Sequence, residues 1–223
     1  MNVSHFQTEF DKMMNRDYFS DKVHPLRQDA FSKFLEIGLP TKKWEDWRFT
    51  NLSSISKGNF RISEIQDAPT GDLDISPYKL KDIDTIVIYN GHYQETLSSI
   101  PSGVQLLSGL DYLEKTNSEF NSPEHSPFDL LNTAFMDSGM SIVVDSNVDV
   151  EKPIRMLFIS SGLESLMVTP RIHIDLGESS SVTFIEHHVG NSTSFFQNES
   201  VFVILGQNAQ LNHIRIQSNS VST

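Results

Sequence analysis

The sequence predicts a mainly β protein: a right-handed parallel β-helix (solenoid) core preceded by a small N-terminal α-helical region. The first observation is a repeat, because the segment Ile172–Glu186 aligns with Val201–Arg215 at a shift of 29 residues. Gly177 falls on Gly206, and each copy has the pattern of a strand, a glycine turn and a second strand. A period of this size, built from two strands and a turn, is typical of a solenoid. Two unrelated hairpins in a β-sandwich are the alternative.

Alternation within the two copies is the second observation. Apolar residues at every second position share one face of a strand, and in a solenoid that face is buried on the next unit. The matching apolar positions are Ile172, Ile174 and Leu176 in the first copy and Val201, Val203 and Leu205 in the second.

Length and composition limit the function. The 223 residues suffice for one large or two small domains, and the 15 phenylalanines suffice for a core. The absence of cysteine excludes disulfides, thiolate metal sites and cysteine nucleophiles in this chain, and favours a reducing, cytoplasmic compartment. A net charge of −12 without a basic stripe argues against nucleic acid and anionic membranes as partners. We find neither an apolar run near the ~20 residues of a membrane span nor a signal peptide.

Residues 1–60 are expected to form the N-terminal helical region. Apolar residues at helical spacing predict helices over residues 4–16 and 25–37, and Gly38 ends the second. The segment Pro40–Leu52 contains both tryptophans. We expect a capped helical turn there, with the indoles packed on neighbouring helices; a ligand site is the alternative.

Residues 61–140 are expected to form a mixed α/β connecting region that leads into the core. The pattern predicts a strand over 84–89, followed by a hairpin turn at Asn90-Gly91. A small helical piece is expected near residues 106–113 and a loop over 117–125. Ser126, followed by proline, marks a helix start with a hydroxyl cap, and this helix is expected to stop at Gly139.

Residues 141–223 are expected to form an incomplete (truncated) parallel β-helix. Strands are predicted over 141–145 and 153–160, before the repeat. Phe202 and Ile204 alternate away from the inward face, so apolar groups occur on both sides of their strand. Either the helical region or another subunit covers the outer face, and the sequence leaves both open.

Common catalytic motifs are missing. No glycine precedes a lysine, which excludes a phosphate-binding P-loop, and the dinucleotide, zinc-protease and serine-hydrolase signatures are absent. We therefore assign no catalytic residue.

The polar cluster that remains is Glu186-His187-His188. On a strand, Glu186 and His188 share one face while His187 points to the other. The 29-residue shift places His187 over Ile216, taken as the inward side, and Glu186 over Arg215 on the outward side. Imidazole and carboxylate suit iron, but two ligands are too few, so we predict no metal site. A buried histidine and an exposed Glu186–Arg215 pair are expected instead.

The segment Leu39–Leu52, with the sequence LPTKKWEDWRFTNL, resembles the N-terminal signature of the SufB/SufD family of SUF iron–sulfur cluster assembly proteins, on its SufD side. Leu131–Phe135, Val150–Ile154 and the pair Pro170-Arg171 agree with it, so the resemblance covers essentially the whole chain. The resemblance implies an N-terminal helical region, a parallel β-helix core and C-terminal helices. It also makes Arg171 a candidate for a role inside an assembly; a structural arginine that bonds turn carbonyls is the alternative.

By this resemblance, later β-helix strands and C-terminal helices would lie beyond Thr223, so a truncated, N-terminal portion is expected. The expected partners are a SufB-like paralogue and a SufC-like ATPase. No cofactor is assigned, and iron or an iron–sulfur cluster is expected only in the assembled complex. An unpaired apolar strand edge at the end of the chain would favour association.

We therefore expect a non-catalytic scaffold subunit of an iron–sulfur cluster assembly complex. A β-helix carbohydrate-active enzyme and a free-standing binding module are the alternatives. The enzyme would need charged and aromatic residues clustered on successive strands, and Glu186 with Arg215 is the one aligned charged pair found.

Overall fold

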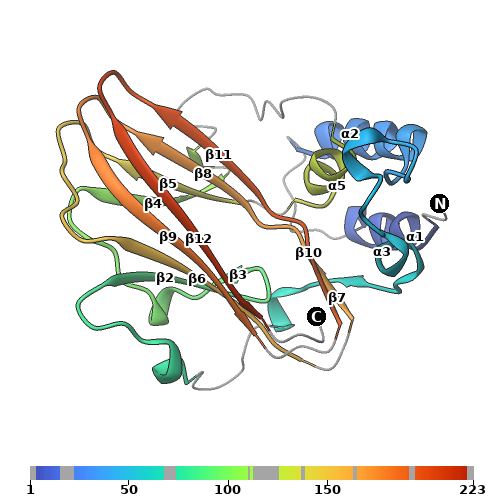
Figure 1. Cartoon of the computed structure of the whole chain (residues 1–223), viewed down its shortest axis with the longest axis horizontal. Coiled ribbons are helices and arrows are strands. Elements are labelled where there is room, and N and C mark those ends of the chain that lie inside the picture. Colours follow the sequence, from blue (N-terminus) through green and yellow to red (C-terminus); the bar gives the residue numbers. More distant parts are fainter. Residues whose placement is uncertain are drawn as a thin grey trace.

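A computed structural model of the chain describes residues 4–15, 23–67, 74–109, 111–112, 126–136, 139–162, 165–190 and 194–219. Its α-helices are α1 (Ser4–Met14), α2 (His24–Ile37), α3 (Ser53–Lys57) and α5 (Pro127–Phe135). Short 3-10 turns lie at Glu45–Trp47, Ile65–Asp67, Ser76–Tyr78 and Glu95–Leu97. The helices α1, α2 and α5 lie together at one end of the molecule, and the long strands occupy the opposite end (Figure 1).

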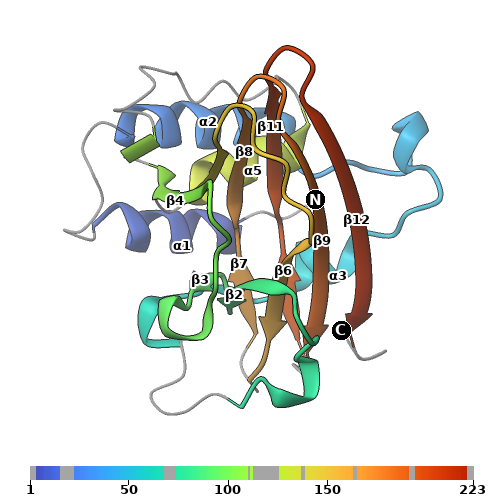
Figure 2. The same ribbon diagram turned by 90° about the vertical axis from the view of Figure 1, so that its left-hand side faces the viewer.

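The strands are β1 (Arg61–Ile62), β2 (Asp84–Tyr89), β3 (His92–Tyr93), β4 (Val104–Ser108), β5 (Met140–Val144), β6 (Ile154–Ser160), β7 (Leu166–Val168), β8 (Arg171–Leu176), β9 (Ser181–Gly190), β10 (Phe195–Gln197), β11 (Ser200–Leu205) and β12 (Gln210–Asn219). They form a five-stranded sheet of order β12-β9-β6-β2-β3, a four-stranded sheet of order β11-β8-β5-β4 and a three-stranded sheet of order β1-β7-β10. Figure 2 shows β9 and β12 as long neighbouring ribbons, with α1 and α2 on the other side of the view.

The strand pairing predicted from the repeat is confirmed. β8 pairs with β11 in parallel, with Leu176 opposite Leu205, and β9 pairs with β12 in parallel, with Glu186 opposite Arg215. The register keeps the 29-residue shift along both pairs, so each apolar residue of one copy lies beside its counterpart in the other.

The predicted fold class, a mainly β protein with a right-handed parallel β-helix core, is wrong. Two of the three sheets are mixed, because β2 pairs with β3 and β4 pairs with β5 in antiparallel fashion. Helices also build one of the main cores, so they are more than a small preceding region. The repeat determines only the pairs β8–β11 and β9–β12, and the antiparallel edges come from segments outside it. The division into 1–60, 61–140 and 141–223 stays a prediction.

The repeated glycines are explained by close approach of neighbouring turns. A Cβ on Gly177 would lie 2.5 Å from the backbone nitrogen of Ser146, and one on Gly206 would lie 2.7 Å from that of Glu178. Real Cβ atoms do not approach backbone so closely, so only glycine lets each turn lie directly on the preceding one.

The first core lies between the two large sheets. Alternate residues of β8 and β9 point into it, in agreement with the period of two that the sequence shows. The fully buried members of this core include Ile86, Ile142, Ile154, Met156, Ile174 and Phe184.

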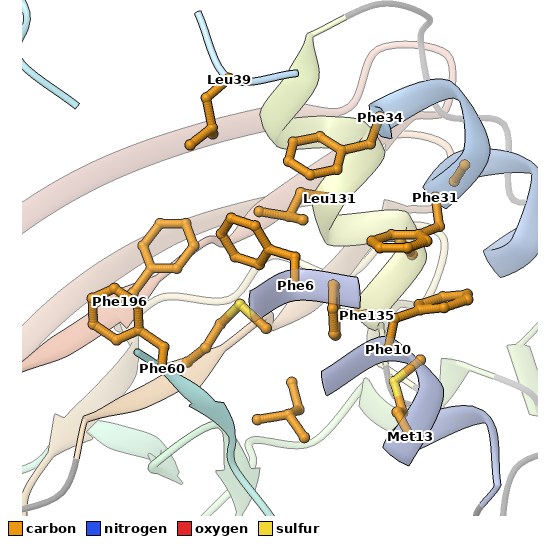
Figure 3. Close-up of a cluster of buried hydrophobic side chains, with 14 residues drawn as sticks. Phe6, Phe10, Met13, Phe31, Phe34, Leu39, Phe60, Leu131, Phe135 and Phe196 are labelled. Atoms are coloured by element: carbon orange, nitrogen blue, oxygen red, sulfur yellow. The ribbon is translucent and has the colours of Figure 1, made fainter. Parts of the chain in front are cut away.

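The second core is aromatic and joins the helices to the three-stranded sheet (Figure 3). Phe6 of α1, Phe34 of α2 and Phe135 of α5 converge there with Phe196 of β10. The rings of Phe6 and Phe34 meet edge-on at 5.6 Å, a favoured aromatic geometry. The helical layer therefore covers the outer face at Phe196, whereas Ile204 on β11 is 51% exposed.

The structure confirms most predicted elements. The helices over 4–16 and 25–37, the strand over 84–89 and its hairpin turn are present. The hydroxyl of Ser126 accepts a hydrogen bond from the backbone of Phe128, as expected for the cap of α5. The expected loop 117–125 and part of the piece 106–113 lie outside the described residues.

Two local predictions need correction. Leu106 and Leu107 lie in β4, a strand, because they pair with β5 and not with a helical neighbour. In the tryptophan segment, the indole of Trp47 packs on Phe128 at 5.1 Å, but Trp44 is exposed. Only one of the two indoles therefore packs on a helix.

Truncation of Phe135 to alanine is expected to lower the free energy of unfolding by about 3–5 kcal/mol, because it opens a cavity among packed rings. Phe49→Ala is the matched control: Phe49 is 86% exposed, so its loss should change stability by less than about 0.5 kcal/mol. Urea unfolding followed by circular dichroism measures both. Equal effects of the two substitutions would contradict the described helical core.

Candidate functional site

A cluster of ionisable side chains lies where β9, β12 and the start of β11 meet. Glu186 and His188 are alternate residues of β9 and share one face. Glu199 lies between β10 and β11, and His213 and Arg215 come from β12. The parallel pairing of β9 with β12 sets Arg215 beside Glu186. Strands from three positions in the sequence thus converge on one polar group.

The side chain of Glu186 is buried, which corrects the predicted orientation. Glu186 is 1% exposed and His188 is 3% exposed, whereas the intervening His187 is only partly buried. Val182 and Phe184 point to the same side as Glu186, into the core between the large sheets. The inward face of β9 is therefore the one assigned outward from the sequence, and the Glu186–Arg215 pair is not an exposed ladder pair.

The carboxylate of Glu186 is the centre of the cluster. Its Oε1 lies 2.5 Å from His188 Nε2 and 2.6 Å from Arg215 Nε. Its Oε2 lies 2.9 Å from His213 Nε2. Three partners for one carboxylate offset the cost of burying its charge.

Glu199 completes the cluster from the other side. Its Oε2 lies 3.6 Å from His188 Nε2 and 3.5 Å from Arg215 Nη2. The amide of Gln197 donates to Glu199 Oε2 at 2.8 Å and lies 3.1 Å from His188 Nδ1. With the amide donating to Nδ1, the imidazole carries its proton on Nε2 and donates it to Glu186.

The two carboxylates have opposite pKa shifts. Burial raises the pKa of Glu199 to about 7, and the negative charge of Glu186 adds to this effect. Burial also acts to raise the pKa of Glu186, but the hydrogen bond from His188 and the charge of Arg215 outweigh it and leave that pKa below its ordinary value. Glu186 is therefore the ionised member of the pair, whereas the positive charges near Glu199 do not offset the effect of burial on its pKa.

The donor set suits a metal ion. One ligand atom from each of Glu186, His188 and Glu199 lies within 4.8 Å of the others. The ring of Phe158 stacks on His188 at 4.6 Å, which fixes the plane of the imidazole. The sequence predicts no metal site because it supplies two candidate ligands, and it does not show that Glu199 lies beside them; the absence of a metal site stays a prediction. The sequence signal for Glu199 was its position as an acidic residue between Phe196, which is buried, and the apolar strand β11.

The other two residues considered from the sequence lie elsewhere. His187 points to the opposite face of β9, with its Nε2 at 3.4 Å from the hydroxyl of Ser218. Arg171 is buried at the start of β8, where its Nη1 donates to Asn132 Oδ1 at 3.1 Å and Thr133 Oγ1 at 2.9 Å. The guanidinium thus bonds side chains of α5, which the sequence did not indicate.

Arg171 also borders a pocket of about 610 Å³ between the helical layer and the sheets. Its walls include Met13 of α1, Phe135 of α5 and Met167 of β7. Most of the lining is apolar, so this pocket offers less chemistry than the cluster around Glu186.

His173 lies between two aromatic rings on β8. Its ring centroid is 5.5 Å from that of Tyr112 and 5.3 Å from that of Phe202. Burial lowers the pKa of His173 to about 4, and the charge of Arg171 adds to the effect. His173 is therefore neutral in the folded protein near pH 7.

From the sequence, His24, His92 and His125 are expected to lie in solvated loops, and the structure agrees with this only in part. His24 is the first residue of α2, and His92 lies in β3 with its Nε2 at 3.2 Å from the hydroxyl of Ser63. His125 lies outside the described residues.

Within the described part of the chain, no helix has both the length and the apolar character needed to cross a lipid bilayer.

The mixed sheets, the helical layer and the buried cluster define an α/β protein without a motif for nucleotide binding or nucleophilic attack. Comparison with known families is more specific. The model of the SufBD protein N-terminal region matches residues 3–156, and that of the SUF system FeS cluster assembly SufBD core domain matches residues 158–223. The chain therefore belongs to the SufBD family.

Two curated relatives agree with this assignment. An iron–sulfur cluster assembly SufBD family protein of Synechocystis sp. is 26% identical over 218 residues, covering 87% of this chain and 47% of the relative. The iron–sulfur cluster assembly protein SufD of Escherichia coli is 26% identical over 201 residues, covering 87% of this chain and 46% of the relative. The chain thus spans about half the length of the curated relatives it matches.

Replacement of Arg171 by alanine is expected to lower the free energy of unfolding by about 3 kcal/mol, because it leaves two buried acceptors on α5 without their charged donor. Arg48→Ala is the matched control. Both guanidinium groups lie over a phenylalanine ring, Phe202 at 4.4 Å and Phe49 at 4.6 Å, but Arg48 is exposed. The control should change stability by less than about 0.5 kcal/mol in urea unfolding. A near-neutral Arg171→Ala would show that the arginine is not structural.

The free energy of unfolding is expected to decrease as the pH falls, and part of this decrease is expected to come from His173. Its pKa is about 4 when folded, below the ordinary value of 6.5 that applies when unfolded, so the unfolded state binds the proton more readily. The stability that the folded state gains from neutral His173 is fully present above pH 6.5 and is lost progressively as the pH falls to about 4. Urea unfolding at several pH values should show that the free energy of unfolding falls less steeply with decreasing pH in His173→Gln than in the wild type. Parallel curves would contradict the assignment.

Proposed function

We propose that the chain acts in SUF iron–sulfur cluster assembly as a non-catalytic scaffold subunit. The observation that carries this proposal is the match of two SufBD family models, which together cover residues 3–156 and 158–223. Both curated relatives are named as iron–sulfur cluster assembly proteins. The lack of P-loop, dinucleotide and hydrolase motifs supports a framework role.

A SufB-like paralogue and a SufC-like ATPase are the partners we propose, in the cytoplasm. The chain lacks a P-loop, so any ATP hydrolysis in the assembly would come from another subunit. The rigid parallel pairs β8–β11 and β9–β12 would supply a frame that transmits movement from that subunit.

The surface of β11 and β12 supports association with further protein. Large apolar side chains are exposed there, and such patches mark interaction surfaces or sites of aggregation. The exposed members are Val203, Ile204, Leu205, Ile214 and Ile216.

The chain contains no cysteine, so it offers no thiolate to an iron–sulfur cluster in transit. As cargo of the assembly, a cluster would be held mainly by groups of other subunits. A scaffold that shapes and supports those groups fits this composition.

Co-purification tests the proposed function. The protein is tagged at its N-terminus at its own chromosomal locus and recovered under anaerobic conditions. A SufB-like chain and a SufC-like ATPase are expected to co-purify in fixed ratio, and a tagged unrelated cytoplasmic protein of similar charge is the control. If both partners are present in the cell and neither is recovered, the scaffold function is wrong.

A further inference from the structure

We propose that Glu186, His188 and Glu199 form a binding site for one divalent first-row transition metal ion, and that the guanidinium of Arg215 takes the place of this ion when the metal is absent. The site uses residues of this chain alone, so it can be tested without the partners that the scaffold function requires.

The first argument is the position of Arg215. Its guanidinium contacts all three proposed ligands: Nε lies 2.6 Å from Glu186 Oε1, and Nη2 lies 3.4 Å from His188 Nε2 and 3.5 Å from Glu199 Oε2. A single positive group thus lies at the point where three donor atoms converge. A tetrahedral metal ion with bonds of about 2.1 Å has its donors roughly 3.4 Å apart. His188 Nε2 lies 3.6 Å from Glu199 Oε2 and 2.5 Å from Glu186 Oε1, so a bound ion would move the Glu186 carboxylate slightly away from the imidazole.

The second argument is an unsatisfied carboxylate oxygen. Among the described residues, Glu199 Oε1 is buried and has no hydrogen-bond partner, and the Glu199 side chain is only 3% exposed. A buried polar atom without a partner costs roughly 1–3 kcal/mol, so native proteins rarely retain one without a reason. A cation bound between the two carboxylates would satisfy it.

The third argument is the difference in solvent exposure between the ligand side chains and the guanidinium of Arg215. Glu186, His188 and Glu199 are buried, whereas Arg215 is 52% exposed at its side chain. The arginine therefore has room to move into solvent without disturbing the strands, and the three ligands stay in place. Exchange of Arg215 for a divalent ion adds one positive charge, which is balanced when the Glu199 carboxyl gives up its proton to solvent.

Neighbouring groups already orient the ligands as metal sites require. Gln197 contacts both His188 Nδ1 and Glu199 Oε2, and Phe158 stacks on the imidazole. Such contacts fix the ring and the tautomer of a metal-binding histidine. On metal binding, the imidazole proton of His188 would pass from Nε2 to Nδ1 by exchange with water, and the amide of Gln197 would flip so that its oxygen accepts from Nδ1–H.

The donor set selects the class of ion. One imidazole and two carboxylates suit Zn²⁺, Fe²⁺, Mn²⁺ or Co²⁺, whereas Ca²⁺ and Mg²⁺ prefer oxygen alone. Cu(I), which prefers sulfur, is disfavoured because the chain has no cysteine. His213, which is 2.9 Å from Glu186 Oε2, is available to orient that carboxylate.

Metal titration of the metal-free, full 223-residue chain tests the site. Calorimetry with Zn²⁺ alone and visible absorption with Co²⁺ alone are expected to show one equivalent bound. Arg215→Gln is the decisive variant, because removal of the competing positive charge should raise the affinity about tenfold or more. A purely structural ion-pair network would give the opposite: no metal binding, and a less stable Arg215→Gln.

Matched variants locate the ion. His188→Gln and Glu199→Gln should each weaken binding about 100-fold or more. His187→Gln, on the opposite face of the same strand, and Glu178→Gln, on an exposed turn, should leave it unchanged. Circular dichroism checks that each variant folds.

If the ligand variants do not fold, NMR of the wild type gives the answer. Co²⁺ should broaden or shift the ring signals of His188 and leave those of His24 unaffected. The proposal is wrong if the wild type and Arg215→Gln bind no more than weak, non-stoichiometric metal, or if binding persists in folded His188→Gln and Glu199→Gln. Because binding is measured on the isolated chain, its failure leaves the co-purification result untouched, and the reverse also holds.

Discussion

The parallel, in-register pairing of β9 with β6 and β12 is the constraint on which the rest of the structure depends. It sets which side chains lie side by side, and a slip of one residue would move every side chain of β9 to the other face. In the native register Phe184 points into the core and Glu186 follows on the same side. The same alternation that builds the core therefore also buries the ionisable cluster.

Much of this strand pairing can be predicted from the sequence, but which face of β9 points into the core cannot. The repeat predicts that Leu176 lies beside Leu205, because apolar and glycine positions recur together. The inner face of β9 is ambiguous because the strand is apolar on both sides, with Phe184 on one and Val189 on the other. Charge is normally placed outward because burial is costly. Glu186 departs from that rule because His188 on its own strand and His213 and Arg215 on the neighbouring strand β12 offset the cost.

The fold class was mispredicted for a related reason. Two copies of a repeat show how two strand pairs form, but they contain no information on β3 and β4. β3 pairs with β2 through a local turn, whereas β4 pairs with β5 across a long intervening segment that includes α5. The aromatic core was also only partly predictable. Helical spacing identifies Phe6 and Phe10 as buried, but it does not identify Phe196, on a three-residue strand, as their partner. Likewise, Glu199 becomes a neighbour of His188 only through the bend between β10 and β11.

The strand β1 has a consequence for how the chain is made. Arg61 pairs with Leu166, so a strand near the N-terminus has no neighbour until more than 100 further residues have left the ribosome. The phenylalanines of α1 and α2 are separated from Phe196 by a still longer stretch of chain. During translation these aromatic side chains are open to water and to other nascent chains, and late closure of this kind makes folding slow. Cells that make the protein therefore have a reason to shield its first half with a chaperone until β7 and β10 arrive.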